Sequence, residues 1–299
     1  MAEPLRVLQL CPKADYYTGA AIQLAELAEG LHRRGHEVVV LILNRGVSFP
    51  LTRFNRLGYT TRRVTAIVAV CESIKRGLVA SGVRANKIHV IYSGTDTERF
   101  NPMVNGRAIR RELGLGPDVF LFTQVGVRSW KGNHDAIDAF ALAAARRPRA
   151  RLLIVGARDP RAFHDRASER GVKDHVFVRG YRHDVPEILA GSGCCVDASY
   201  AGLGLTGTLR EALAVETPVI ASDLEGNPEL VRDGQTGILF PARDVPALAA
   251  AMVRMMDEPT LAETTARAGR RLVAAKFSTR AKLEATEDLY RRLLEGSSP

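Results

Sequence analysis

Short apolar runs separated by segments of helical periodicity make up most of this chain. Strands that alternate with helices of about 10–15 residues predict a parallel sheet with helices on both of its faces. The fold class expected from this pattern is therefore α/β. The predicted strands are residues 5–10, 36–43, 65–71 and 87–94 in the first third, and 120–126, 150–156, 175–181, 194–198 and 218–222 further on.

Helices are predicted between these strands from apolar spacing and capping residues. In the segment 20–34, one side is apolar at Ile22, Leu24, Leu27 and Leu31. Gly35 follows directly, where a helix commonly ends on a left-handed glycine. The other predicted helices are residues 73–82, 107–113, a helix ending at 145, 160–170, a helix opening at 208, and an amphipathic tail at 277–294.

A glycine-rich stretch between residues 202 and 231 is the strongest candidate for a ligand site. Gly202, Gly204 and Gly207 precede the helix expected to open at Thr208. Glycines let the backbone bend sharply, and the free N–H groups and dipole of a helix start attract an anion. Such turns lie at the carboxyl ends of parallel strands, where open α/β sheets bind ligands.

This stretch resembles the donor-binding signature of the family-four glycosyltransferases (glycosyl transferases group 1), which are retaining enzymes. The residues that carry the resemblance are Glu211-Ala212, Pro218-Val219, Ala221, Asp223, Gly226 and Pro228-Glu229. An earlier run is also similar, at Gly94, Asp96, Arg99-Phe100 and Pro102. The resemblance implies a GT-B fold, with two Rossmann-like parallel-sheet domains.

The first domain departs from the family pattern. Only residues 44–63 separate the second predicted strand from Thr65, and family members usually have further β-α units there. We therefore expect a truncated acceptor-side domain at residues 1–95 and a donor-binding domain at 96–277. The resemblance implies that the C-terminal helix, 278–299, packs back on the first domain; the alternative is an ordinary surface helix on the second.

The resemblance also implies roles for individual residues. Departure of a diphosphate anion requires preorganised positive charge and N–H dipoles, and Arg128 and Lys131 would supply the charge. Glu211 would accept hydrogen bonds from the donor ribose, and these three are the expected catalytic residues. The donor-binding residues expected on the same basis are Gly19, Gly126, Arg182, Leu203, Gly204, Thr206, Gly207, Thr208, Leu209 and Glu211.

Each of these residues also has a purely structural interpretation. Thr208 and Glu211 have the spacing of a capping box, which alone would account for the glutamate. Arg128 and Lys131 could be solvated cations on a loop. Leu203 stands where the family has its first glutamate, and only Gly19 of a Gly-Gly loop is kept.

The function implied is transfer of a hexose from a nucleotide-diphosphate sugar to a lipid-linked or polysaccharide acceptor with retention, in the EC 2.4 class. The alternative is a nucleotide-sugar-binding pseudoenzyme, or a partner of a complete transferase. Leu203 and the short first domain favour the alternative. Lys131, Glu211 and the intact loops favour the enzyme.

The chain carries a net charge of +9, of which residues 1–94 contribute +7 from 13 Lys/Arg and 6 Asp/Glu. A basic domain suits an anionic membrane or phosphorylated substrates, and an arginine-rich composition alone would also explain the charge. We expect a cytoplasmic protein, because no apolar run reaches about 18 residues and no signal peptide is evident. The basic first third suggests peripheral contact with the inner face of the cell membrane.

No cofactor, metal or nucleic-acid partner is expected. No G-x-G-x-x-G follows a predicted strand, which argues against a dinucleotide enzyme. The cysteines, Cys11, Cys71, Cys194 and Cys195, lack C-x-x-C spacing, and no Asp-x-Asp pair occurs.

The abbreviated first domain would leave a sheet edge or helix face uncovered, so a homodimer or a partner protein is expected to cover it.

Overall fold

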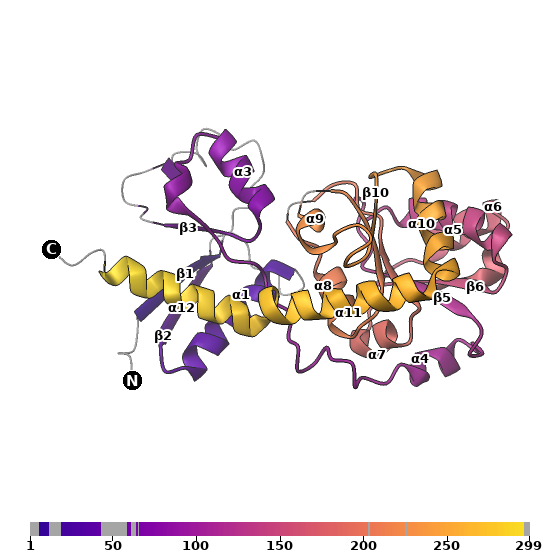
Figure 1. The fold of residues 1–299 in the computed structure, drawn as a ribbon, viewed down its shortest axis with the longest axis horizontal. Helices are drawn as coiled ribbons and strands as arrows, with labels where there is room; N and C mark the ends of the chain where they lie inside the picture. Colours follow the sequence, from indigo (N-terminus) through magenta and orange to yellow (C-terminus); the bar gives the residue numbers. More distant parts are fainter. Residues whose placement is uncertain are drawn as a thin grey trace. The chain divides into compact units, whose positions relative to one another are not determined.

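A computed structural model describes residues 6–11, 19–42, 59–60, 64, 66–202, 204–224 and 226–295, with side chains for most of them from residue 23 onward. The chain divides into two compact units, and each is described separately (Figure 1). Unit 1 comprises residues 1–96 and 275–299. Unit 2 comprises residues 97–274.

Unit 2 is built on a six-stranded parallel sheet with the order β10-β9-β8-β5-β6-β7. The predicted α/β class is confirmed, because each long apolar run became a buried parallel strand. In the register of the sheet, Thr123 lies opposite Leu153 on one side and Cys195 on the other. The strands are β5 (Phe120–Val125), β6 (Ala150–Val155), β7 (Val176–Arg179), β8 (Cys194–Asp197), β9 (Val219–Ser222) and β10 (Ile238–Phe240).

Strand order reverses between β5 and β8. From β5 the chain proceeds to β6 and then β7 on one side, and it returns to β8 on the other side of β5. In open parallel sheets such a reversal leaves a crevice at the carboxyl ends of the two central strands, where ligands bind. The loops that follow β5 and β8 therefore define where a site is expected in unit 2.

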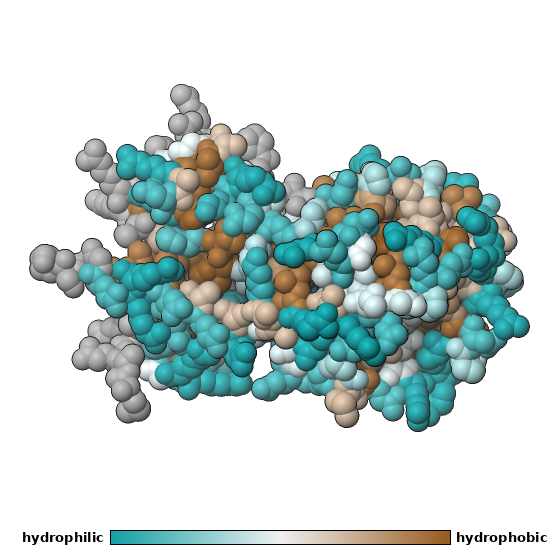
Figure 2. All heavy atoms as spheres, in the orientation of Figure 1, coloured by the Kyte–Doolittle hydropathy of each residue, from teal (hydrophilic) through white to brown (hydrophobic). Residues whose placement is uncertain are grey.

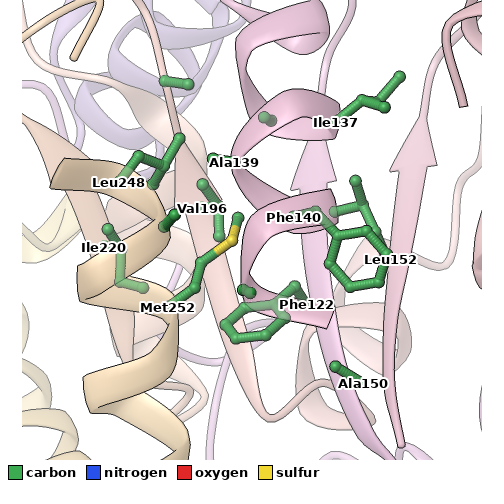
Figure 3. Close-up of a cluster of buried hydrophobic side chains, with 14 of the residues drawn as sticks. Phe122, Ile137, Ala139, Phe140, Ala150, Leu152, Val196, Ile220, Leu248 and Met252 are labelled. Carbon is green, nitrogen blue, oxygen red and sulfur yellow. The ribbon is translucent and has the colours of Figure 1, made fainter. Parts of the chain in front are cut away.

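Apolar side chains cover both faces of the sheet, since successive residues of a strand point to opposite sides. On one face, Phe122 and Leu152 pack under Phe140 of α5 (Asn133–Arg146) and Met252 of α10 (Val245–Asp257) (Figure 3). On the other, Leu121, Leu153 and Val155 pack with Ile109 and Ile188. That second face is covered in part by α4 (Arg107–Glu112) and α7 (Val185–Ala190).

Part of unit 2 was not assigned from sequence. Strand β10 is only three residues long, which is too short to show a periodicity, and neither it nor α10 is among the predicted elements. The remaining elements of unit 2 are α6 (Arg161–Glu169), α8 (Gly207–Ala214), α9 (Asn227–Leu230), α11 (Pro259–Lys276) and the short 3-10 turn Lys173–His175. A second 3-10 turn, Ala85–Lys87, lies in unit 1.

Among its described residues, unit 1 contains two separate parallel strand pairs. Strand β1 (Arg6–Cys11) pairs with β2 (Glu37–Ile42), and α1 (Gly19–Arg33) lies between them in sequence. Strand β3 (Ile67–Ala69) pairs with β4 (Ile88–Val90), with α3 (Glu72–Ala80) between them. The four strands predicted for the first third are present, and most of segment 44–63 lies outside the described residues.

Helix α12 (Thr279–Glu295) belongs to unit 1, where it packs on α1. Leu283 contacts the cluster around Leu31, Glu287 forms an ion pair with Arg34 at 3.0 Å, and a Glu287 carboxylate oxygen lies 3.4 Å from Nε2 of His36. The Lys282 ammonium donates to the main-chain oxygen of Gln23. Apolar and polar contacts therefore both join the C-terminal helix to α1.

Hydrophilic side chains cover most of the visible face of unit 2, and hydrophobic residues appear on it only in small patches (Figure 2). Within the described ranges, no helix is both long enough and apolar enough to cross a membrane.

Replacing Phe140 with alanine should lower the free energy of unfolding of unit 2 by about 3–5 kcal/mol, because its fully buried ring fills the space between α5 and the sheet. Urea unfolding followed by the fluorescence of Trp130, the single tryptophan, measures this unit. Leu142→Ala on the same helix is the matched control, since that side chain is 51% exposed. Equal losses in the two variants would contradict the packing described.

Candidate functional site

The loops after β5 and β8 touch through their backbones. Gly132 has a φ of 63°, and a Cβ atom placed on it would lie 2.0 Å from the carbonyl oxygen of Ala198. Gly126, directly after β5, also has a positive φ, of 93°. Glycine is required at position 132 both by its conformation and by this contact.

Tyr200 connects the same two loops through its backbone and its side chain. Its N–H donates to the carbonyl of Trp130 at 2.9 Å, and its hydroxyl donates to the carbonyl of Ser129. The guanidinium of Arg243 lies 4.0 Å above the Tyr200 ring, within cation–π distance. Arg243 has a φ of 67°, rare for a residue with a side chain. Together these contacts hold residues 129–130 against the loop after β8.

Lys131 lies at the reversal point of the sheet. Its ammonium is 2.6 Å from Oδ2 of Asp197, the last residue of β8, and the two side chains are only 16% and 3% exposed. The amide of Gln124 donates to the Lys131 carbonyl at 2.8 Å, which holds the backbone. Lys131 is therefore a partly buried, paired cation and not a solvated one.

Arg128 differs from Lys131 in its surroundings. Its side chain is exposed, and its guanidinium donates to the neighbouring carbonyl of Val127 at 2.7 Å. The structure therefore places Arg128 on the same loop as Lys131 but outside the buried pair.

Helix α8 begins one residue earlier than predicted, at Gly207, with Thr206 as its N-cap. The capping-box interpretation of Thr208 and Glu211 is therefore wrong, because Thr208 is not the N-cap residue. The N-cap makes no side-chain capping hydrogen bond, and the first turn contains no acidic residue. Oε1 of Glu211 is 3.9 Å from the point where a Cβ on Gly207 would lie, so the carboxylate is directed toward the first turn.

Asn227 supports the loop before α8. Its side-chain oxygen accepts from the N–H of Thr206 at 3.4 Å, and its amide donates to the carbonyl of Ser222 at 3.2 Å. Asn227 is buried at the first position of α9. Asn227 thus connects the segment after β9 to the loop before α8. These two segments are the two halves of the sequence signature.

The thiol of Cys195 in β8 lies among the charges of the site. Burial is the main reason why its pKa is raised, and the charges of Asp197 and Glu211 raise it further while Lys131 opposes them. Lys131 and Asp197, whose charged atoms lie 2.6 Å apart, meet at the end of this strand. Sequence reasoning missed Asp197; its signal was a carboxylate directly ending the apolar run of residues 194–196.

Arg182 is not brought into this cluster. It follows β7 at the edge of the sheet, and its guanidinium donates to both carboxylate oxygens of Glu112 at 3.1 and 2.9 Å. It also binds Asp184 at 2.8 and 2.6 Å. These charge-assisted bonds lower the pKa of Glu112 and of Asp184. Arg182 thus joins the loop after β7 to α4.

The other predicted donor-binding residues have varied positions. Gly204 has a φ of 90° in the loop before α8, and Thr208 lies in the first turn of that helix. Leu209 is fully buried, so its side chain faces the core. Gly19 is the first residue of α1 in unit 1. Leu203 lies outside the described residues.

The described part of the chain contains no group of three or more His, Cys, Asp or Glu residues that could hold a metal ion. Cys71, Cys194 and Cys195 are free and buried. The groups at the ends of β5 and β8 are thus the Lys131–Asp197 pair and, after the loop that follows β8, the start of α8, whose free N–H groups can meet an anionic ligand.

Comparison with known proteins shows the family of this chain. A family model described as Glycosyl transferases group 1 matches residues 117–258, and one described as Glycosyltransferase Family 4 matches residues 48–99. The chain belongs to this family, the group 1 or family-four glycosyltransferases, and has their α/β GT-B fold. The resemblance inferred from the signature residues is confirmed.

Individual relatives have low sequence identity with this chain. EpsD of Bacillus subtilis (strain 168), itself named only as a provisional glycosyltransferase, is 30% identical over 72% of this chain and 56% of its own length. The capsular polysaccharide biosynthesis glycosyltransferase CapM of Staphylococcus aureus is 26% identical over 78% of this chain and 63% of its own. This chain thus spans between half and two thirds of the length of these relatives.

A solved structure of similar length shares the fold. The crystal structure of Anabaena Alr3699/HepE in complex with UDP-glucose has a TM-score of 0.76 with 18% identity. The match covers 96% of this chain and 99% of that one.

Gly132→Ala should destabilise unit 2 more than Gly114→Ala. The two glycines have nearly equal φ values, 63° and 64°, but a Cβ at position 114 meets nothing within 4 Å. Both variants should lose about 1–2 kcal/mol of stability to backbone strain, and Gly132→Ala about 1–3 kcal/mol more from crowding against Ala198. Urea unfolding followed by Trp130 fluorescence measures the difference; equal losses would show that the loops can separate without cost.

Proposed function

We propose that this chain is a retaining glycosyltransferase that transfers a hexose from a nucleotide-diphosphate sugar. The observation that carries the proposal is the position of Lys131 at the reversal point of the sheet, where it is paired with Asp197 at the end of β8, the strand that leads to the loop before α8. An oxygen–carbon bond to a diphosphate breaks most readily where fixed positive charge and N–H dipoles meet the departing anion. Lys131 and the first turn of α8 supply both.

The other expected site residues take roles around this centre. Arg128 adds an exposed positive charge on the loop after β5, where it can contact the outer phosphate oxygens. Glu211 is the proposed acceptor for ribose hydroxyls, because its carboxylate lies at the first turn of α8. The two glycines with positive φ, Gly126 and Gly204, let the backbone approach the ligand closely.

The relatives suggest which ligands to test first. HepE was solved with UDP-glucose, so uridine diphosphate is the first nucleotide we propose. CapM is named for capsular polysaccharide biosynthesis, which supports a lipid-linked or polysaccharide acceptor. The basic first third of the chain would favour contact with an anionic membrane surface, and a homodimer or partner protein is proposed to cover the exposed Val68, Val70 and Val79 of unit 1.

One sequence feature favours a second function. Leu203 stands where the family has a carboxylate, and leucine cannot accept a hydrogen bond from a donor-sugar hydroxyl. A protein that holds the nucleotide well and the sugar loosely would bind nucleotide sugars without turning them over. A nucleotide-sugar-binding pseudoenzyme, or a partner of a complete transferase, is therefore the alternative.

A nucleoside diphosphate should bind to the wild-type protein, and Lys131→Ala should weaken that binding by about 10- to 150-fold, the effect of losing one hydrogen bond to a charged group. Isothermal titration calorimetry with UDP, ADP and GDP measures it. Lys173→Ala, which removes an exposed lysine just before the amino end of β7, is the matched control. Binding of none of the three nucleotides, or binding that ignores Lys131, would overturn the proposed site.

Leu203→Glu distinguishes the two functions. Restoring a hydrogen-bond acceptor for the sugar should raise the rate of transfer or of donor hydrolysis by about 10-fold or more and leave UDP affinity nearly unchanged. Release of UDP from UDP-glucose measures the rate, and Leu203→Gln separates the effect of charge from that of polarity. High wild-type turnover that Leu203→Glu reduces would show that an apolar contact at this position serves the sugar.

A further inference from the structure

Asp197 places a buried negative charge in a site that we propose for an anion. Its side chain is 3% exposed, and its Oδ2 is 2.6 Å from the Lys131 ammonium. Its other oxygen, Oδ1, accepts from the N–H of Ser199 at 3.2 Å. A lysine that bound diphosphate alone would not need this carboxylate.

Holding the two loops together does not account for Asp197. The loops already meet through the backbone contact of Gly132 with Ala198 and through both hydrogen bonds of Tyr200. A buried ion pair adds little net stability compared with apolar packing, because both charges lose their hydration. The pair must therefore be explained by what it does to Lys131.

We infer that Asp197 is a positioning residue that holds the Lys131 ammonium at the ends of β5 and β8 and lowers the affinity of the site for a diphosphate. This inference rests on the proposed function. An ammonium has three N–H donors; Asp197 engages one and thereby directs the remaining donors. The lysine and the carboxylate together carry no net charge, so they attract a bound diphosphate less than a lysine alone would.

The consequence for catalysis is a lower affinity for the donor and for the released nucleotide. Interactions that strengthen only as charge develops on the leaving group raise the rate, whereas uniformly tight binding does not. Lys131, held in place by Asp197, is ready to meet the developing charge without moving. After transfer, the carboxylate competes with the diphosphate for the ammonium and so promotes release.

Asp197→Asn tests the inference, because asparagine keeps the shape and one acceptor oxygen but removes the charge. Calorimetry with UDP and with inorganic pyrophosphate should show affinities higher than wild type by about 10-fold or more. Pyrophosphate lacks base and ribose, so it reports on the diphosphate position alone. Asp174→Asn, an exposed carboxylate just before β7, is the control for a change of net charge.

The effect should depend on Lys131. In a Lys131→Met background, Asp197→Asn should raise the affinity for UDP and for pyrophosphate by clearly less than it does in the wild type, because only direct repulsion by the carboxylate is then relieved and the gain made through the ammonium is lost. With UDP-glucose as donor, Asp197→Asn should lower both KM and kcat for UDP release. A residue that only stabilised the fold would lower the fraction of active protein, and so the apparent kcat, but would leave KM unchanged. If Asp197→Asn does not fold, as judged by Trp130 fluorescence, Asp197→Ser carries the same expectations.

The outcomes separate this inference from the proposed function. Unchanged or weaker UDP and pyrophosphate binding by Asp197→Asn, in a protein where Lys131→Met weakens binding, would overturn the role of Asp197 alone. An equal gain in the presence and absence of Lys131 would do the same. Wild-type protein that binds neither UDP nor pyrophosphate, or binds them regardless of Lys131, would overturn the proposed site and this inference with it.

Discussion

The parallel pairing of β5 with β8 is the constraint on which the candidate site depends. Phe122 lies opposite Cys194 and Thr123 opposite Cys195, so the two strands end side by side. This register brings Lys131, after β5, to Asp197, at the end of β8. It also brings Gly132 so close to Ala198 that only glycine fits. A shift of register by one residue would turn every side chain to the other face of the sheet and separate these groups.

Packing on both faces of the sheet maintains that register. Phe122 and Phe140 belong to the cluster between the sheet and helices α5 and α10, whereas Leu121 and Leu153 belong to the cluster on the opposite face. Apolar burial in a close-packed interior tolerates little displacement. The loops at the carboxyl ends are consequently carried on rigid strands, which suits a site that must hold charges in fixed positions.

The arginines of unit 2 described below form ion pairs that stabilise the fold and lie outside the candidate site. Arg147 binds Asp257 at 2.7 and 2.6 Å between α5 and α10, and Arg166 binds Asp138 at 2.5 Å between α6 and α5. Arg182 is similarly engaged by Glu112. Such pairs near the surface contribute modestly to stability. They show that an arginine-rich composition does not by itself indicate an anionic partner, and that Lys131 is distinguished by its place at the strand reversal.

The sequence by itself determined every strand of unit 2 except β10, most of its helices and the family, because apolar runs, capping residues and signature motifs are properties of adjacent residues. It also predicted Lys131 as a site residue. Only the tertiary structure decided the partners of the charges. Asp197 meets Lys131 across 66 residues and Arg182 meets Glu112 across 70, so neither pair follows from local spacing. Those partners depend on which strands lie side by side, and the order of strands in a sheet is set by packing of distant segments, which hydrophobic periodicity does not encode.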